Sequence, residues 1–223
     1  MRLFELARST CGALAAIALL ATAAHAVPLT PEELAKVCAD AEDTSHCGRL
    51  VEAVQLKRLP NLAVRDGVTL RVSLFPSGTA TLADTEALNG GRSYSLWDFL
   101  NELNAVVLYT TDGDDVTFTV VQRATGRKTE LPSDPKVSPD RTHLVTADFC
   151  ETRCVNELAV WRVTRDGIHK EWTWKPRDPW SDAVASWKSA DTVAIEYTAA
   201  GTQSRSRVER RLDDPSWVRA GSP

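Results

Sequence analysis

The sequence predicts a mostly β protein: an open antiparallel meander of propeller-blade-like sheets, preceded by a small helical hairpin. Residues 30–59 carry helical spacing and helix-capping residues. From Val68 onward, short apolar runs alternate with turn residues, and no long amphipathic helix is visible. Three segments of that region repeat a strand–turn–strand pattern about 40 residues apart, as propeller blades do. A β-sandwich is the alternative fold.

The first 26 residues of the 223-residue chain are expected to be a removable export signal. Arg2 and Arg8 form a positively charged start before an apolar run over residues 12–24, and Ala24-His25-Ala26 supplies the small residues of a cleavage site. A membrane-spanning helix needs roughly 20 apolar residues, and this run is shorter. We therefore expect cleavage after Ala26, a periplasmic or secreted protein, and no membrane span in the mature chain.

The composition narrows the class of partner. The chain has 26 Lys and Arg against 30 Asp and Glu, for a net charge of −4. Nucleic-acid binding needs clustered basic residues, so we expect no nucleic acid as a partner. Residues 204–211 are locally basic, and their alternation is typical of a solvated, charged edge strand. With 43% hydrophobic residues, the chain is too apolar for disorder.

Four cysteines remain after Ala26, and they allow three disulfide pairings. The spacing favours Cys38 with Cys47 and Cys150 with Cys154, because each pair flanks a predicted turn. A metal site built from the thiolates, or including His46, is the alternative. In an exported protein disulfides are the better explanation, so we expect no metal and no cofactor.

Residues 27–60 are expected to form a helical hairpin. Thr30 can cap the first helix, Pro31 suits its first position, and Glu33 completes a capping box. A second helix places Cys47 on the same stripe as Leu50, Val51 and Val54, and it ends near Leu59 because Pro60 follows. The first disulfide would join the end of one helix to the start of the next.

Residues 61–223 are expected to form the β-rich part. Strands are predicted at residues 68–74, 79–82, 94–100 (or a short helical turn), 105–110, 116–123, 143–149, 155–164, 168–174, 183–187, 192–198 and 206–212. The acidic segment 112–115 is interpreted as a hairpin turn, since the rest of a calcium-binding loop is absent from the sequence. Asp166-Gly167 predicts a type I′ hairpin turn.

The three repeated segments cover residues 101–130, 138–174 and 187–212. Val137-Ser138-Pro139-Asp140, followed by an apolar strand up to Asp148, resembles the SPDG blade motif of TolB-like β-propellers, with Arg141 at the glycine position. The resemblance implies four-stranded antiparallel units and protein-binding surfaces, and it implies no catalysis. Closed propellers have four to eight blades. We therefore expect an open arrangement, with the helical hairpin covering one sheet edge.

Tryptophans supply the candidate binding residues. Trp172 and Trp174 lie on one side of their strand because strand side chains alternate. Together with Trp180 they suit either an aromatic platform for a ligand or the packing between sheets, and packing is favoured. Trp180, between Pro179 and Ser181, is expected in an exposed loop and is the best contact candidate.

No catalytic residues are nominated. The chain lacks a G-x-S-x-G elbow, an H-E-x-x-H motif and a phosphate-binding loop. Asp148 and Glu151 could in principle form a carboxylate pair of the kind that glycosidases use, but the sequence does not fix the distance between them. The leading hypothesis is an exported, non-catalytic module that binds another protein through loops of its β-sheets. The alternatives are a cell-envelope hydrolase with a carboxylate site, and an inhibitor or immunity protein acting on an enzyme in the same compartment.

Overall fold

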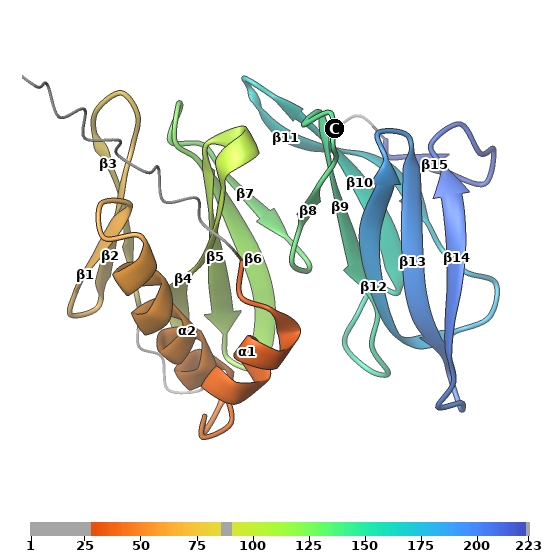
Figure 1. Cartoon of the computed structure of the whole chain (residues 1–223), viewed down its shortest axis with the longest axis horizontal. Helices are drawn as coiled ribbons and strands as arrows, with labels where there is room; N and C mark the ends of the chain where they lie inside the picture. Colours follow the sequence, from red (N-terminus) through yellow and green to blue (C-terminus); the bar gives the residue numbers. More distant parts are fainter. Residues whose placement is uncertain (1–27, 86–90, 222–223) are drawn as a thin grey trace, which may run out of the picture.

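The structure, a computed structural model, describes residues 28–85 and 91–221. It contains two helices and four antiparallel sheets that stand side by side, and none of the sheets closes on itself (Figure 1). The predicted fold class, an open set of blade-like sheets with N-terminal helices, is confirmed. The expected export signal at residues 1–26 lies outside the described residues.

We number the sheets 1 to 4 along the chain. Sheet 1 contains β1 (Ala63–Asp66), β2 (Thr69–Ser73) and β3 (Thr79–Ala83). Sheet 2 contains β4 (Arg92–Leu100), β5 (Ala105–Asp112), β6 (Asp115–Gln122) and β7 (Lys128–Leu131), with the 3-10 turn Asn101–Leu103 between β4 and β5. Sheet 3 contains β8 (Lys136–Val137), β9 (His143–Asp148), β10 (Glu157–Thr164), β11 (Gly167–Trp174) and the C-terminal β15 (Val218–Arg219). Sheet 4 contains β12 (Trp180–Ser189), β13 (Thr192–Ala199) and β14 (Arg205–Arg211).

An apolar core fills each of the three spaces between successive sheets. Each core contains buried residues from both of its sheets, for example Leu70 and Leu96, Leu131 and Leu144, and Val160 and Ile195. Sheets 2 and 3 are therefore buried on both faces, whereas sheets 1 and 4 each have one face in solvent. The sequence follows this arrangement: β3 and β12 alternate between exposed and buried residues, but β10 begins with an unbroken buried run.

The N-terminal helices begin and end as the sequence predicts. In α1 (Pro31–Val37) the backbone N–H of Glu33 donates to Thr30 Oγ1, 3.2 Å, and the N–H of Thr30 donates to Glu33 Oε2, 2.8 Å. Asp43 caps α2 (Thr44–Arg58), which ends before Pro60. The disulfide between Cys38 and Cys47, with Cα atoms 4.9 Å apart, joins the two helices as predicted.

Helix α2 covers the free edge of β4, which confirms the expectation that the hairpin protects a sheet edge. Glu52 Oε2 accepts a hydrogen bond from the backbone N–H of Leu96, 2.9 Å, and Gln55 Nε2 donates to the carbonyl of Trp97, 2.7 Å. The approach is close at Gly48, where a Cβ atom would lie 2.8 Å from Tyr109 Cδ1. Helix side chains therefore satisfy backbone groups that a further strand would otherwise bind.

A largely buried ion-pair network joins sheet 1 to this helix. Arg65 of β1 donates to both carboxylate oxygens of Glu52, 2.8 and 2.7 Å, and the Glu52 side chain is only 4% exposed. Arg49 of α2 and Arg65 both contact the carboxylate of Asp84, and both donate to the carbonyl of Tyr94. Every charge in the network thus has an opposite partner, as burial requires.

The second disulfide is also the predicted one. Cys150 and Cys154, with Cα atoms 5.3 Å apart, close the loop between β9 and β10. Because all four described cysteines are paired, they are not metal ligands, and no three His, Cys, Asp or Glu side chains of the described ranges gather to hold a metal. Two disulfides fit an extracellular or periplasmic protein. Within residues 28–85 and 91–221 no helix has the length and apolar character needed to cross a membrane.

Several local features differ from expectation. The sequence did not indicate β1, β7, β8 or β15, which are short. The turn between β10 and β11 is not type I′: Thr164 pairs with Gly167, and among residues 165–167 only Gly167 has a positive φ, 140°. Arg141 has a φ of 64°, a left-handed conformation that glycine adopts without strain.

Candidate functional site

The candidate site is an open hollow of about 540 Å³ between sheets 3 and 4. Its walls come from the end of β11, the loop 175–179, the first residue of β12, the inner faces of β13 and β14, and the segment between β14 and β15. The residues that line it are Trp174, Lys175, Pro176, Arg177, Asp178, Trp180, Tyr197, Val208, Arg210 and Ser216. We call it the aromatic hollow. It combines elements that are far apart in sequence, because sheet 4 folds back onto sheet 3.

Stacked rings build its apolar wall. The rings of Trp180 and Tyr197 lie 3.9 Å apart and nearly parallel, and Trp174 lies 5.4 Å from Trp180. Phe149 supports Trp180 from the core side, 5.1 Å away. Such contacts fix the ring positions before any ligand arrives.

The expectation that Trp180 lies exposed in a loop is wrong. Trp180 is the first residue of β12, belongs to the core between sheets 3 and 4, and is 7% exposed. Its neighbour Pro179 ends the loop, and the strand then places the indole on the inner face, against Tyr197. Trp180 lines the hollow although little of its surface is exposed, and a role in binding stays a prediction.

The structure brings Trp174 and Trp180 together and leaves Trp172 apart. Trp172 and Trp174 do share a face of β11, as alternation predicts, and both pack toward sheet 4. The Trp172 ring, however, which is two residues before Trp174 in β11, lies 5.6 Å from the His143 ring and does not line the hollow.

Cations form the rim of the aromatic hollow. The guanidinium carbon of Arg210 lies 4.2 Å from the centre of the Trp174 ring, a cation–π contact. Arg210 Nη1 donates to Asp214, 3.3 Å, and to Ser216, 3.0 Å, while its buried Nε has no hydrogen-bond acceptor among the described residues. Lys175 and Arg177 are exposed on the adjoining loop. Three cations and one acid, Asp178, line the hollow. Because Arg210 is paired with Asp214, Lys175 and Arg177 are the exposed cations that favour a negatively charged ligand.

Hydrogen bonds hold Asp214 ionised beside Arg210. Bonds from the hydroxyl and the N–H of Ser216, together with the charge of Arg210, lower the pKa of Asp214 below its usual value. The Asp214 carboxylate therefore orients the guanidinium over Trp174.

The sequence analysis nominated neither Tyr197 nor Arg210. A signal existed for Arg210: alternation in the basic strand places it on the same face as Val208, opposite Arg207, Glu209 and Arg211. No sequence signal shows that this face meets the end of β11.

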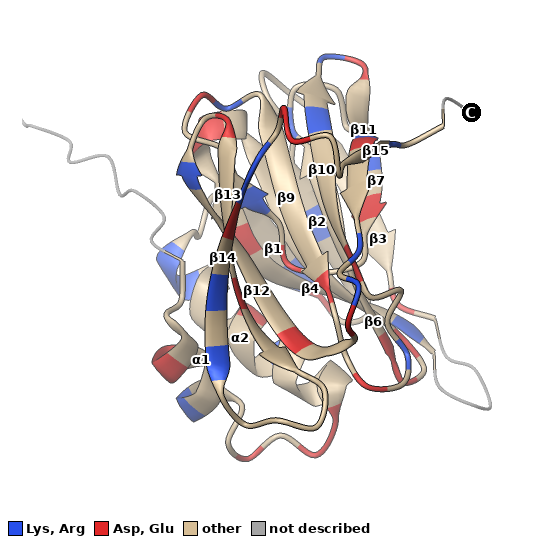
Figure 2. Ribbon diagram, turned by 90° about the vertical axis from the view of Figure 1, so that its right-hand side faces the viewer, with Lys and Arg blue, Asp and Glu red and all other residues tan. Residues whose placement is uncertain are grey.

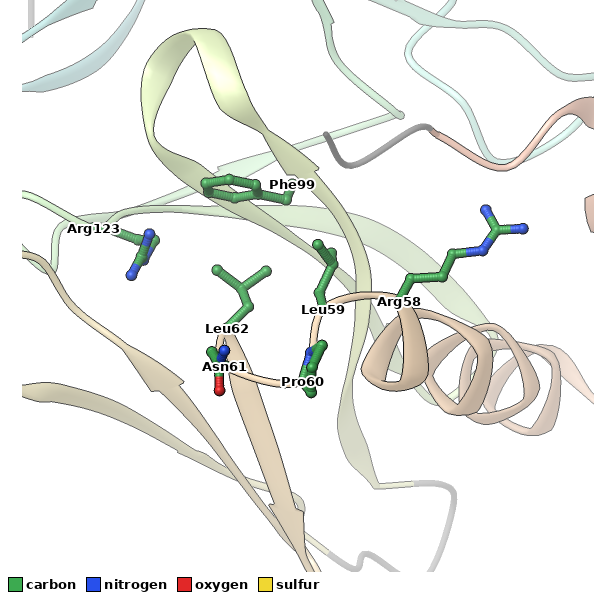
Figure 3. Close-up of a pocket in the computed structure, with 7 residues that line it drawn as sticks. All are labelled: Arg58, Leu59, Pro60, Asn61, Leu62, Phe99 and Arg123. Carbon is green, nitrogen blue, oxygen red and sulfur yellow. The ribbon is translucent and has the colours of Figure 1, made fainter. Parts of the chain in front are cut away.

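A second hollow, of about 250 Å³, lies where α2 meets sheets 1 and 2 (Figure 3). Leu59 and Leu62 point toward Phe99, with Arg123 at one side, and Arg58 extends away (Figure 3). Arg123 Nε donates to the Ser73 carbonyl, 2.6 Å, and Nη1 donates to Asn104, 2.9 Å. These bonds hold the guanidinium in the framework between the two sheets.

A third cavity, of about 250 Å³, contains a carboxyl group with a perturbed pKa. Asp98 and Asp134 line it together with Lys136, Trp97 and apolar side chains from residues 28–34 and from β12. Burial raises the pKa of Asp98, and the charge of Asp134 adds to this effect, while a hydrogen bond from the Phe99 N–H and the charge of Lys136 oppose it.

The carboxylates considered from the sequence are arranged differently. Asp148 lies opposite Glu157 in the β9–β10 ladder, and Glu151 is exposed in the disulfide loop. Burial and the charge of Glu157 raise the pKa of Asp148, which accepts a hydrogen bond from the Val155 N–H, 2.9 Å. Lys170 Nζ binds Glu157 at 2.9 Å. The carboxylate nearest to Asp148 in the ladder is thus Glu157, and Glu151 lies in the loop.

His143 belongs to a series of hydrogen-bonded polar side chains. Its Nδ1 lies 2.8 Å from Thr142 Oγ1, and its Nε2 lies 3.3 Å from Glu171. The Thr142 hydroxyl also donates to Asp140, 2.7 Å, and Glu171 binds Arg162 through two hydrogen bonds. This series of hydrogen bonds connects the turn before β9 to β11.

Comparisons with known proteins give no relative. No protein family, no curated protein and no solved structure matches the chain. The resemblance to TolB-like β-propellers stays a prediction from residues 137–148. Function must therefore be argued from the site, and the fold and site together define a class: a disulfide-bonded open stack of four sheets with an aromatic, cation-rimmed hollow.

Proposed function

We propose that this protein is exported with loss of residues 1–26 and serves as a non-catalytic module that binds another protein through the aromatic hollow and its loops. The observation that carries the proposal is the combination in one hollow of stacked Trp180 and Tyr197 rings with the Arg210 guanidinium. Tryptophan, tyrosine and arginine are the residues that supply most binding energy at protein interfaces.

Rigidity supports the same proposal. The rings and Arg210 belong to strands, and the loop 175–179 is short and contains two prolines. A site whose groups are already fixed loses little conformational entropy on binding. The excess of cations at the rim favours a partner whose contact surface is acidic.

Site-specific cross-linking tests the proposal. The full chain, exported in cells, would carry a photo-cross-linking amino acid in place of Arg177, at the rim of the hollow. We expect a discrete cross-linked partner from this position and none from Thr81, an exposed residue on the outer face of sheet 1. Arg177→Glu should weaken capture by roughly tenfold, since it reverses a charge at the rim. Equal capture by Arg177→Glu and the unchanged protein would contradict the proposal.

One observation favours a second candidate, the cell-envelope hydrolase. A carboxyl group with a raised pKa in a cavity, such as Asp98 beside Asp134, can act as a general acid. Turnover of purified cell-wall glycan or peptide that disappears in Asp98→Asn, with the fold intact by circular dichroism, would support it. If the cross-linked partner is instead an enzyme, loss of that enzyme's activity on binding would favour the inhibitor or immunity protein.

A further inference from the structure

We infer that the partner binds by adding an extended, acidic strand to the edge of β14, with one apolar side chain entering the aromatic hollow. The inference rests on the proposed function and specifies its binding mode. It combines two independent observations: a regular, unpaired strand edge, and a hollow that opens directly beside it.

The edge is long and regular. β14 pairs with β13 over its full length, from Arg205 with Thr198 to Arg211 with Thr192, without a bulge. Sheet 4 ends at β14, so within the described residues no strand binds the other side of β14. Near its end, Trp217 Nε1 donates to the Arg211 carbonyl, 2.8 Å, which leaves Arg205–Glu209 as the accessible part. Figure 2 shows β14 at the outside of the molecule.

The hollow lies on the inner side of this edge. Val208 and Arg210 of β14 both line it, and the Tyr197 ring of β13 lies next to them. In neighbouring strands, side chains on the same face stand about 5 Å apart. A residue of an added strand that faces inward beside Val208 would therefore extend over the mouth, where an aliphatic or aromatic side chain can contact Tyr197.

The outer side favours acidic residues. β14 carries four arginines and one glutamate in seven residues. Arg205, Arg207 and Arg211 share the outer face with Glu209, and their exposed side-chain fractions are 52%, 57% and 62%. Each of these arginines contacts an exposed carboxylate of sheet 4 or of the loop after it, and such solvent-exposed pairs are weak enough for an acidic strand to replace. Positions of an added strand that face outward would stand beside these arginines. Exposed ion pairs contribute little affinity, but they select the partner's charge pattern, while backbone hydrogen bonds and the inward side chain supply the affinity.

A charged edge also protects a sheet from aggregation, and that role alone requires no partner. The two explanations differ in one measurable respect. In strand addition, backbone N–H groups of alternate peptide residues donate to β14, while the others point away. A peptide held only by its side chains makes no such bonds, so its affinity does not depend on which set of its N–H groups is blocked.

The test uses the full-length mature chain and the blocked peptide Val-Glu-Val-Glu-Phe-Glu-Val-Glu-Val. One version carries N-methyl groups on the glutamates, and a second carries them on the apolar residues. We expect one version to lose at least tenfold in affinity and the other to bind like the parent peptide. Hydrogen exchange should slow at alternate amides of Arg205–Glu209 when the parent peptide is bound. No binding of the parent peptide up to about 1 mM, or equal binding of both methylated versions, would overturn the inference.

Variants locate the contact. Val208→Glu places a charge at the mouth and should abolish binding, whereas Thr81→Glu on edge strand β3 should leave it unchanged. If Val208→Glu fails to fold, Arg207→Glu gives the same information through its charge: affinity for the parent peptide falls, and affinity for the peptide with lysine in place of glutamate rises. Cross-linking at Arg177 with equal binding of both methylated peptides would retain the proposed function and reject strand addition. Failure of the cross-linking test would reject the proposed function itself.

Discussion

The carboxylate of Glu52 on α2 accepts a hydrogen bond from the backbone N–H of Leu96 on β4, so that a helix side chain binds a strand edge. The same carboxylate binds the guanidinium of Arg65, which belongs to sheet 1. One residue thus connects α2, sheet 1 and sheet 2. Because Glu52 is buried, its hydrogen bonds cannot be replaced by bonds to water, and its loss should be costly.

Glu52→Gln tests this role. The substitution removes one of the two negative charges that pair with the largely buried Arg65, the other being Asp84, and breaking a buried pair typically costs about 3–5 kcal/mol. We expect a loss of this size in the free energy of unfolding, measured by urea titration. Asp66→Asn is the matched control: its pair with Arg71 is exposed, so the change should cost about 0–1 kcal/mol. Equal losses in the two variants would contradict the account.

Gly48→Ala sets helix propensity against packing. Alanine in place of glycine within a helix favours folding by about 1 kcal/mol. The added Cβ would lie 2.8 Å from Tyr109, whose ring stacks on Trp97 at 5.0 Å and cannot readily move. Overpacking costs about 1–3 kcal/mol, so we expect net destabilisation. A stabilised Gly48→Ala variant would show that α2 lies farther from sheet 2. Ala53→Gly, on the exposed face of α2, is the control, because it measures the effect of helix propensity on stability without a packing effect.

Arg141→Gly should stabilise the protein. A residue with a side chain at a φ of 64° is strained by about 1–2 kcal/mol, and glycine is not. Part of the gain is lost because glycine makes the unfolded chain more flexible. We expect thermal and urea unfolding to report a net gain of about 0.5–1 kcal/mol. Arg165→Gly, at a turn position whose own φ is not positive, should instead destabilise, and a loss at both positions would refute the strain argument.

The pH dependence of stability should identify Asp98. Its pKa is raised in the folded state, so the folded state binds the proton more tightly than the unfolded state does. The stabilisation from this group is complete below the unfolded pKa, about 3.9, and is lost as the pH rises through the raised folded pKa. Asp98→Asn should therefore match the unchanged protein near pH 3, and exceed its stability at pH 7.

Asp140 supplies a control of opposite sign. Slight burial raises its pKa, but hydrogen bonds from Ser138 and Thr142 outweigh this and hold the pKa below its usual value. Its stabilisation is present above the unfolded pKa and is lost as the pH falls through the folded pKa. Asp140→Asn should then be less stable than the unchanged protein at pH 7. Urea titrations at several pH values measure both variants, and the same sign for both would contradict these assignments.

Local patterns were enough to predict much of the fold. The capping residues of α1, the alternation in β12 and the turn residues between strands depend on near neighbours in the chain. The two disulfides were predictable for the same reason, because each spans only a short loop. Local information also misled: Pro179 and Ser181 indicated a loop around Trp180, although the core between sheets 3 and 4 requires a large ring there.

The candidate site was predictable only in part. Trp174 and Trp180 were nominated, but nothing in the sequence shows that Tyr197 and Arg210 join them. Their meeting depends on how sheet 4 packs on sheet 3, which is set by the summed burial of many apolar residues rather than by any motif. The short strands β1 and β7 were missed because each contains several polar residues and takes its place from pairing with a neighbour.

The path of the chain through sheet 4 has a mechanical consequence. The chain leaves sheet 3 after Trp174 and returns at Val218, where β15 pairs with β11 (Figure 1). Tension applied at the C-terminus is therefore borne first by the short β15–β11 ladder. Until that ladder ruptures, sheet 4 and any strand bound to its edge carry none of the load.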